Sequence, residues 1–262
     1  MRNRITSLFS SGKKDVLSIF YTAGFPTLND TVEIANELEK AGADIIEIGI
    51  PFSDPVADGP TIQQSNKVAL DNGMNVKLLL EQVREIRKTV KLPIILMGYL
   101  NPVMQYGVEK FVKDAADAGV DGLILPDMPV YEFEERYKAL FQQNNMCNTF
   151  LISPTTSEDR IRRIDAMTEG FIYAVSASST TGAKKEFSAE QVTYFEKLKN
   201  MNLKNPILIG FGISDRETFT KASGYGAGAI VGSAFITLLQ NSSALSSDIA
   251  MFITKLKGNI KG

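Results

Sequence analysis

Eight short apolar runs, rich in β-branched residues, recur along this chain of 262 residues and alternate with stretches of helical periodicity. Runs of this length and composition are typical of strands buried on both faces of a parallel sheet. Strands that alternate with helices form a doubly wound sheet or a closed barrel, and eight units in this length favour a single α/β barrel, (β/α)8. The runs are Val16–Thr22, Asp44–Ile50, Pro93–Tyr99, Asp121–Pro126, Asn148–Ser153, Phe171–Ser176, Pro206–Gly212 and Gly228–Gly232.

The segments between the runs have the apolar spacing of amphipathic helices. No linker or low-complexity segment divides the chain, so residues 1–262 are predicted to form one barrel domain. The basic N-terminus has an apolar run, Ile5–Phe9, that is too short for a signal peptide. It predicts an additional N-terminal helix on the bottom of the barrel, with a transit peptide as the alternative. The helical segments are Thr31–Lys40, Val76–Thr89, Glu109–Ala118, Tyr131–Gln143, Glu158–Met167, Ala189–Asn200, Arg216–Ser223, Phe235–Leu239 and Ser247–Lys257.

Three helix-to-strand junctions share a pattern, in the motifs KAGADIIEI, DAGVDGLIL and GYGAGAIVG. Each places a glycine after the helix and before the next strand. Glycine is the residue that most readily ends a helix in the left-handed conformation, so we expect a left-handed cap at each junction.

The residue types that are absent limit the chemistry. The chain contains no His, no Trp and one Cys, which excludes a Ser-His-Asp triad, a His-ligated metal, a Cys-rich zinc site and an internal disulfide. Acid-base chemistry near neutral pH must come from carboxylates, Lys or Tyr with shifted pKa values. With a formal net charge of -2, the chain has no excess of positive charge of the kind that binds nucleic acid. The uncharged stretch 222–247 is too polar for a membrane span, and we expect a cytoplasmic protein.

Glu47 lies inside the second apolar run, between Ile46 and Ile48, which point to the other side of the strand. A charged side chain inside a barrel strand costs free energy unless it is paired or functional. An ion pair with another strand would explain it, but none of the eight runs contains Lys or Arg. Because barrel active sites lie at the C-terminal ends of the strands, we predict a catalytic role for Glu47.

The loop that follows, residues 51–60, carries two further carboxylates, Asp54 and Asp58. A long loop stiffened by Pro and Gly in a compact barrel is more often functional than idle. Asp58 is either catalytic, which we favour, or the N-cap of a helix that starts near Thr61. Asp54 is expected to support the loop or to face a partner.

Two glycine-rich turns end the seventh and eighth runs, at Gly210–Ser214 and Val231–Ala234. Glycine lets backbone N–H groups approach an anion, and the second turn opens a helix whose N-terminus attracts negative charge. Barrels often bind phosphate in these two loops, although ordinary tight turns have the same composition. Residues 176–191 predict a mobile lid or, alternatively, a surface loop without function. Tyr99 and Asn101, which end and follow the third run, either contact substrate or form hydrogen bonds with backbone groups of a turn.

A phosphate site beside two carboxylates predicts chemistry on a sugar phosphate. A class II aldolase needs a His-bound metal and a class I aldolase needs a Lys on a barrel strand, and the sequence has neither. A glycosidase would use two carboxylates, but a phosphate pocket argues against one. An isomerisation remains, or a C–C cleavage whose substrate supplies its own electron sink.

The run DIIEIGIPFSDPVADGPTIQ closely resembles the signature of the tryptophan synthase alpha chain family. The motifs SIFYTAGFP, GYLNPV, LILPDMP, FIYAVSASSTTG, IGFGIS and VGSA agree in the family's order, so the resemblance covers essentially the whole chain. It implies a lyase that cleaves indole-3-glycerol phosphate to indole and glyceraldehyde 3-phosphate, with the indole ring as the electron sink. It implies no cofactor or metal in this chain, and a β-chain partner that uses pyridoxal phosphate to join indole with serine. The implied assembly is an αββα heterotetramer with an internal tunnel for indole.

The resemblance also implies roles for individual residues. Glu47 would protonate C3 of the indole ring and accept the proton of the side-chain hydroxyl, and burial should raise its pKa, as a general acid requires. Asp58 would stabilise the indolenine N–H, and Thr181 of the lid would organise Asp58. The other implied substrate contacts are Tyr173 near Glu47, Gly182 in the lid, Gly212, Gly232 and Ser233 at the phosphate, and Phe20, Ile62, Tyr99 and Leu125 at the indole ring, while Asp54 and Pro55 would face the β chain.

Three rival functions remain open at this point. A stand-alone indole-3-glycerol phosphate lyase would release free indole without a β chain. Another phosphate-binding barrel, such as an isomerase, would leave the loop 51–60 unexplained. A non-catalytic barrel kept as an allosteric partner or scaffold would need neither Glu47 nor Asp58.

Overall fold

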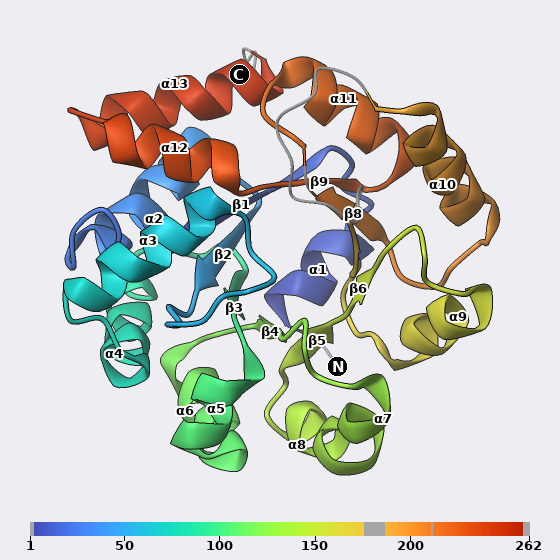
Figure 1. Cartoon of the computed structure of the whole chain (residues 1–262), viewed down its shortest axis with the longest axis horizontal. Coiled ribbons are helices and arrows are strands. Elements are labelled where there is room, and N and C mark those ends of the chain that lie inside the picture. The colour runs from blue at the N-terminus through green and yellow to red at the C-terminus, as the bar shows by residue number, and fades with distance from the viewer. Residues whose placement is uncertain (1–2, 176–186, 211, 259–262) are drawn as a thin grey trace.

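The computed structural model describes residues 3–175, 187–210 and 212–258, and in this part of the chain nine parallel strands form one sheet in the order β5-β4-β3-β2-β1-β9-β8-β7-β6. The strands at the two ends of this order are separated in sequence by Phe150 alone, so the sheet closes on itself (Figure 1). This confirms the predicted (β/α)8 TIM barrel. The strands are β1 (Val16–Thr22), β2 (Ile45–Gly49), β3 (Ile94–Met97), β4 (Gly122–Ile124), β5 (Cys147–Thr149), β6 (Leu151–Ile152), β7 (Ile172–Val175), β8 (Ile207–Gly210) and β9 (Gly228–Val231).

The predicted fifth strand is divided at Phe150. The Phe150 carbonyl still accepts the N–H of Tyr173 at 3.0 Å, so pairing with β7 continues across the break. The Phe150 ring packs against Phe133, with the ring centroids 5.3 Å apart, in the layer between barrel and helices. The division is therefore a local bend in one strand, which the apolar pattern alone does not reveal.

Helices surround the barrel in Figure 1. The predicted helix over 131–143 is interrupted, because a π-helical segment η1 (Phe133–Tyr137) lies between α7 (Val130–Glu132) and α8 (Lys138–Gln143). A short helix, α5 (Leu100–Tyr106), follows β3 where we expected a turn. No helix among the described residues is long and apolar enough to cross a membrane. The other helices are α1 (Arg4–Ser10), α2 (Asp30–Ala41), α3 (Pro60–Asp71), α4 (Val76–Ile86), α6 (Val108–Ala118), α9 (Glu158–Met167), α10 (Ala189–Asn200), α11 (Arg216–Tyr225), α12 (Ser233–Asn241) and α13 (Leu245–Lys257).

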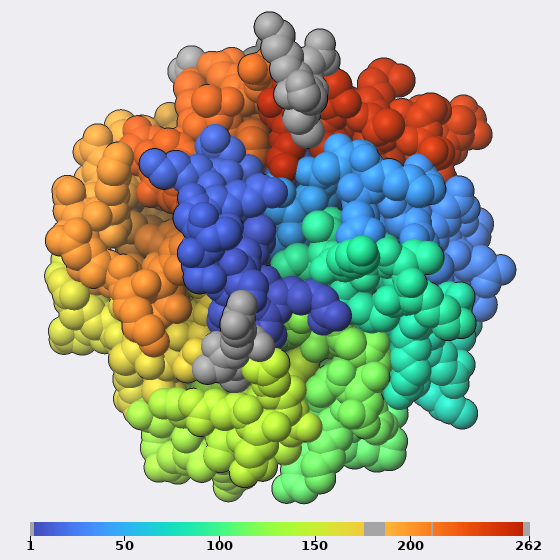
Figure 2. Space-filling model, turned by 180° about the vertical axis from the view of Figure 1, so that it is seen from behind, coloured from blue at the N-terminus to red at the C-terminus, as the bar shows by residue number. Residues whose placement is uncertain are grey.

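Side chains along each strand alternate between the barrel interior and the layer under the helices. Ile45 belongs to the interior cluster, which Ile5 of α1 joins from below. In Figure 1 α1 is seen through the ring of strands, and Figure 2 shows from behind that the N-terminal segment lies across this opening. The predicted N-terminal helix on the bottom of the barrel is confirmed. Glu47 lies two residues after Ile45 on β2, so its side chain also points into the barrel.

Two of the three predicted glycine caps are confirmed. Gly42 and Gly119 end α2 and α6 in the left-handed conformation, with φ values of 94° and 97°. The prediction for the third junction is wrong, because Gly226 ends α11 in an extended conformation with φ -132°. A Cβ at Gly226 would lie 2.6 Å from the carbonyl oxygen of Ile207, so close packing of backbones explains this glycine.

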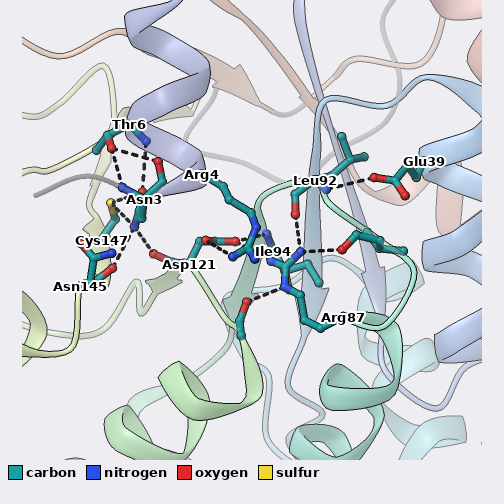
Figure 3. Close-up of polar contacts among 12 residues, drawn as sticks. Asn3, Arg4, Thr6, Glu39, Arg87, Leu92, Ile94, Asp121, Asn145 and Cys147 are labelled. Carbon is teal, nitrogen blue, oxygen red and sulfur yellow. Dashed lines mark hydrogen bonds and ion pairs between the residues drawn. The ribbon is translucent and has the colours of Figure 1, made fainter.

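A buried ion-pair cluster holds the closed end of the barrel together (Figure 3). The Asp121 carboxylate accepts from Arg4 Nη1 at 3.0 Å, from the Ile94 N–H at 2.9 Å and from Arg87 Nη2. The side chains of Asp121 and Arg87 are only 3% and 9% exposed. Asn3 of the N-terminal segment donates to the Asp121 carbonyl at 2.8 Å. Arg87 also donates to the backbone carbonyls of Gly119, Val90 and Leu92.

Candidate active site

The Glu47 side chain is fully buried in the barrel interior. Its Oε1 atom accepts the hydroxyl of Ser18 at 2.6 Å, while Oε2 has no hydrogen-bond partner among the described residues. No cation is paired with it in that part of the chain. Burial raises the pKa of Glu47 to about 7, and the hydrogen bond from Ser18 opposes this rise. Such a carboxyl can both give and take a proton near neutral pH.

The raised pKa of Glu47 predicts a pH dependence of stability. In the folded protein the Glu47 carboxyl keeps its proton up to a pH of about 7. In the unfolded chain it loses this proton at the usual glutamate pKa of 4.5. The stabilising protonated form is therefore fully present below pH 4.5 and is lost as the pH rises through about 7. We expect this group to lower the free energy of unfolding by about 3 kcal/mol across that window, and the Glu47→Gln variant to lack this component. Urea unfolding at pH 5 and pH 8 measures it, and equal pH dependence in both proteins would contradict it.

Tyr173 lies on β7 and is 6% exposed in the interior cluster that holds Ile45. Burial, followed by the charges of Glu47 and Asp58, raises the pKa of its phenol well above the usual value. Its hydroxyl is therefore neutral and within electrostatic reach of both carboxylates. A Cβ at Gly210 would lie 2.2 Å from Tyr173 Cε2, so the ring lies directly over this glycine of β8.

Asp58 is held by Tyr99. The Tyr99 hydroxyl donates to Asp58 Oδ2 at 3.2 Å and accepts the N–H of Ala57 at 3.0 Å. Burial raises the pKa of Asp58, and the hydrogen bond from Tyr99 opposes the rise. The alternative role as a helix cap is wrong, because α3 begins after Gly59 and no side chain caps it. The Asp58 carboxylate is thus available to a ligand.

Amide side chains of α3 hold the loop 51–60, and the sequence analysis had not singled them out. Gln63 Nε2 donates to the Asp58 carbonyl at 2.9 Å, and Asn66 Oδ1 accepts the Phe52 N–H at 3.0 Å. Asn66 is 6% exposed. The available signal was the polar segment Gln63–Asn66, which begins three residues after Pro60, the last residue of the loop.

The two glycine turns lie on neighbouring strands, because Gly210 of β8 pairs with Ile230 of β9. Gly212 has φ 78°, in the left-handed region. Gly232 precedes Ser233 at the start of α12, and no side chain caps that helix. The first backbone N–H groups of a helix have no acceptor within the helix, so this end is suited to an anion.

Phe20 connects the second turn to the strand that carries Glu47. A Cβ at Gly232 would lie 3.5 Å from the Phe20 ring, and one at Gly49 would lie 2.7 Å from it. The ring therefore lies between β9 and β2, above the paired residue Glu47. This position suits a wall between a phosphate and a reacting ring.

The other predicted site residues have different surroundings. Ile62 is half-buried on α3, and Leu125, directly after β4, is 3% exposed. Asp54 is exposed, whereas Pro55 is buried in the isolated chain. Thr181 and Gly182 lie outside the described residues.

Ser18 is a further residue of this site that sequence reasoning missed. It is fully buried on β1, and among the described residues it is the only side chain that donates a hydrogen bond to Glu47. The available signal was a small hydroxyl in the middle of the first apolar run, between Leu17 and Ile19.

No group of three or more acidic or Cys side chains that could hold a metal occurs among the residues described.

The chain is similar to known proteins of one family. A family model described as tryptophan synthase alpha chain matches residues 8–261. The tryptophan synthase alpha chain of Flavobacterium johnsoniae is 53% identical over 255 residues, covering 97% of this chain and 100% of the relative. That of Bacteroides thetaiotaomicron is 48% identical over 259 residues, covering 99% of this chain and 100% of the relative.

Solved structures give the same result. Tryptophan synthase subunit alpha from Legionella pneumophila has a TM-score of 0.87 and 35% identity, and covers 98% of both chains. A chain of the tryptophan synthase complex from Pyrococcus furiosus has a TM-score of 0.86 and 32% identity, with 94% of this chain and 99% of that chain covered. The resemblance therefore extends over nearly the whole length of each chain.

Proposed function

This chain belongs to the tryptophan synthase alpha chain family and is an enzyme of tryptophan synthesis, and from that premise we propose that it is a carbon-carbon lyase. Its substrate is indole-3-glycerol phosphate, and its products are indole and glyceraldehyde 3-phosphate. The chain uses no cofactor of its own, and pyridoxal phosphate belongs to the β chain that receives the indole. The proposed location of the reaction is the cytoplasm.

The observation that carries the proposal is the buried carboxyl of Glu47, with a pKa of about 7. At this pKa the same group can act first as an acid and then as a base. Protonated Glu47 donates to C3 of the indole ring, which becomes an electron-accepting indolenine. The resulting carboxylate takes the proton of the glycerol hydroxyl while the C–C bond breaks and its electrons return to the ring. This sequence needs neither a metal nor a Schiff base.

The surrounding groups support the charges that develop in this reaction. The Asp58 carboxylate, held by Tyr99, accepts the ring N–H, where positive charge appears in the indolenine. The turns at Gly212 and Gly232 bind the phosphate through backbone N–H groups. Phe20 lies between the turn at Gly232 and Glu47 and limits the space for the indole ring.

Three exposed apolar side chains support a protein partner. Val56, Met104 and Tyr131 are 86%, 61% and 58% exposed. They follow β2, β3 and β4 in turn, on the loop 51–60, α5 and α7, so they share the rim at the strand ends. Exposed apolar side chains gathered in this way mark interaction surfaces. We propose that a β chain covers this rim and the exposed Asp54, in an αββα tetramer that channels indole.

The test is indole release from indole-3-glycerol phosphate by the purified chain, alone and with an added β chain. Cleavage that rises with the β chain supports the proposal. High activity that the β chain does not change supports the stand-alone lyase. Absence of cleavage under both conditions would contradict the proposal and favour either an enzyme that acts on another sugar phosphate or a non-catalytic scaffold.

Gly212→Ala tests the phosphate site. A side chain at φ 78° is strained by about 1 kcal/mol, and relaxation of this strain moves the N–H groups of the turn. We expect KM for indole-3-glycerol phosphate to rise about tenfold, with a smaller effect on kcat, since phosphate contacts bind ground state and transition state alike. Gly224→Ala is the matched control, because Gly224 is helical and a Cβ there meets nothing within 4 Å. Equal KM values for the two variants would contradict the assignment.

A further inference from the structure

Ser18 and Glu47 form an asymmetric pair. The Ser18 hydroxyl donates to Oε1 of Glu47 at 2.6 Å, and both side chains are fully buried. The other oxygen, Oε2, is buried without a hydrogen-bond partner among the described residues. A buried polar atom without a partner costs free energy and needs an explanation, and at a candidate acid-base residue a catalytic role is one. The two oxygens of this carboxyl therefore have different surroundings.

We propose that Ser18 is a positioning residue that holds Oε1 of Glu47 and so leaves Oε2 as the oxygen that exchanges protons with the substrate. This inference rests on the proposed function. In the neutral carboxyl, Oε1 is the carbonyl oxygen that accepts from Ser18, and Oε2 carries the proton. That proton moves from Oε2 to C3 of the ring, and the hydroxyl proton of the substrate returns to Oε2, so that Glu47 ends the cycle as it began.

The hydrogen bond also adjusts the acidity of Glu47. Burial raises the pKa of this carboxyl and the Ser18 hydroxyl, which stabilises the charged form, lowers it. Of the residues opposite Glu47 on the neighbouring strands, Phe20 and Ile95 do not titrate. The titratable groups in this part of the site are Tyr173 of β7, whose phenol is neutral, and Asp58 of the loop, and the charges of Glu47 and Asp58 both raise the pKa of Tyr173. Removal of the Ser18 hydroxyl leaves these groups in place.

Ser18→Ala is the test, with two readouts. One is the titration of the Glu47 carboxyl by carbon-13 NMR of the glutamate-labelled chain, with the signal assigned by its absence in Glu47→Gln. The other is the pH profile of kcat for indole release with the β chain present. We expect the carboxyl midpoint and the alkaline limb of kcat both to rise by about one pH unit, because one hydrogen bond to the charged form is lost. We expect kcat at neutral pH to fall about tenfold while KM changes less than about twofold.

Two further variants separate positioning from a merely structural role. Ser18→Thr keeps a hydroxyl at the same place and should restore both the midpoint and kcat. Thr22→Val is the matched control, because Thr22 is a fully buried hydroxyl on the same strand that contacts Ser65 Oγ at 2.7 Å and has no contact with Glu47. It should leave the midpoint and the alkaline limb unchanged. An unchanged midpoint in Ser18→Ala, or an equal shift in Thr22→Val, overturns the inference.

The two readouts also distinguish this inference from the proposed function. The carboxyl titration needs no substrate, so it decides whether Ser18 controls Glu47 even if the wild-type chain cleaves nothing. Absence of cleavage in the wild type overturns the proposed function and the assignment of Oε2 together. Cleavage with an unchanged carboxyl midpoint overturns only the role of Ser18.

Discussion

Glu47→Gln should lower kcat for indole release by about 10³-fold and leave the fold intact, because an amide can neither donate the ring proton nor accept the hydroxyl proton. The amide has nearly the same shape as the carboxyl, and Gln can still accept the Ser18 hydroxyl through its carbonyl oxygen. The loss should therefore appear in kcat and not in KM. Steady-state indole release with the β chain present measures it.

A matched control for this variant is Glu85→Gln. Glu85 is an exposed glutamate on α4 that pairs with Lys88, and its side chain is 55% exposed. It should retain the wild-type kcat and KM. If Glu47→Gln keeps more than about a tenth of the wild-type kcat, acid-base catalysis by Glu47 is excluded, since such a group contributes about 10²-fold or more. The same protein should show the altered pH dependence of unfolding described above, which tests burial of the carboxyl separately from catalysis.

Arg87→Met should lower the free energy of unfolding by about 4 kcal/mol, because it leaves the buried Asp121 carboxylate without its buried cation. Burial lowers the pKa of Arg87 to about 10, so the guanidinium keeps its charge at neutral pH. The remaining cationic partner of Asp121, Arg4, has a side chain that is 47% exposed and pairs more weakly. Met fills most of the volume of the Arg stem, so the lost interactions dominate the effect. Urea unfolding at pH 7 measures it.

Two further variants give this experiment its controls. Lys88→Met changes the next residue, whose side chain is 67% exposed and pairs with Glu85, and should alter stability by less than about 0.5 kcal/mol. Adding Asp121→Asn to Arg87→Met removes the unpaired charge, while the amide oxygen can still accept the Ile94 N–H, and should recover about half of the loss. KM should stay at the wild-type value, because this cluster closes the end of the barrel opposite the site. A loss of less than about 1 kcal/mol in Arg87→Met would show that the buried pair does not hold this end together.

The repeat of strands and helices was predictable because each element carries its own period. The apolar runs and the helical stripes between them predicted the barrel and the helix at its bottom. Three irregularities were not predictable. Phe150, at the strand bend, packs against Phe133, and Gly226, at the extended cap, lies against the backbone of Ile207, so two of them depend on contacts between elements. The apolar pattern of 131–143 does not distinguish the π-helical segment η1 from a regular helix.

The candidate site was predictable in part. Glu47 was predictable because its carboxyl lies inside an apolar run, and none of the eight apolar runs contains a Lys or Arg that could pair with it. Tyr99 and Ser18 were not predictable in the same way, because their roles depend on contacts with residues far away in the sequence. The motif at the end of the third run does not separate a substrate contact from a turn residue at Tyr99, and the resemblance implies a contact with the indole ring; the structure brings its hydroxyl to Asp58. The sequence does not single out Ser18, because a buried hydroxyl in a strand often serves only packing or a local hydrogen bond, as that of Thr22 on the same strand does with Ser65.

By itself the sequence determined the strands, the side of β2 on which Glu47 lies, and the absence of His-based chemistry, because these depend on residue type and on the two-residue period of a strand. Only the tertiary structure decided which groups meet. Ser18 reaches Glu47 across 29 positions, Tyr99 reaches Asp58 across 41, and Arg87 reaches Asp121 across 34. The register between β1 and β2 and the closure of the barrel set these contacts, and neither is encoded in the pattern of a single segment.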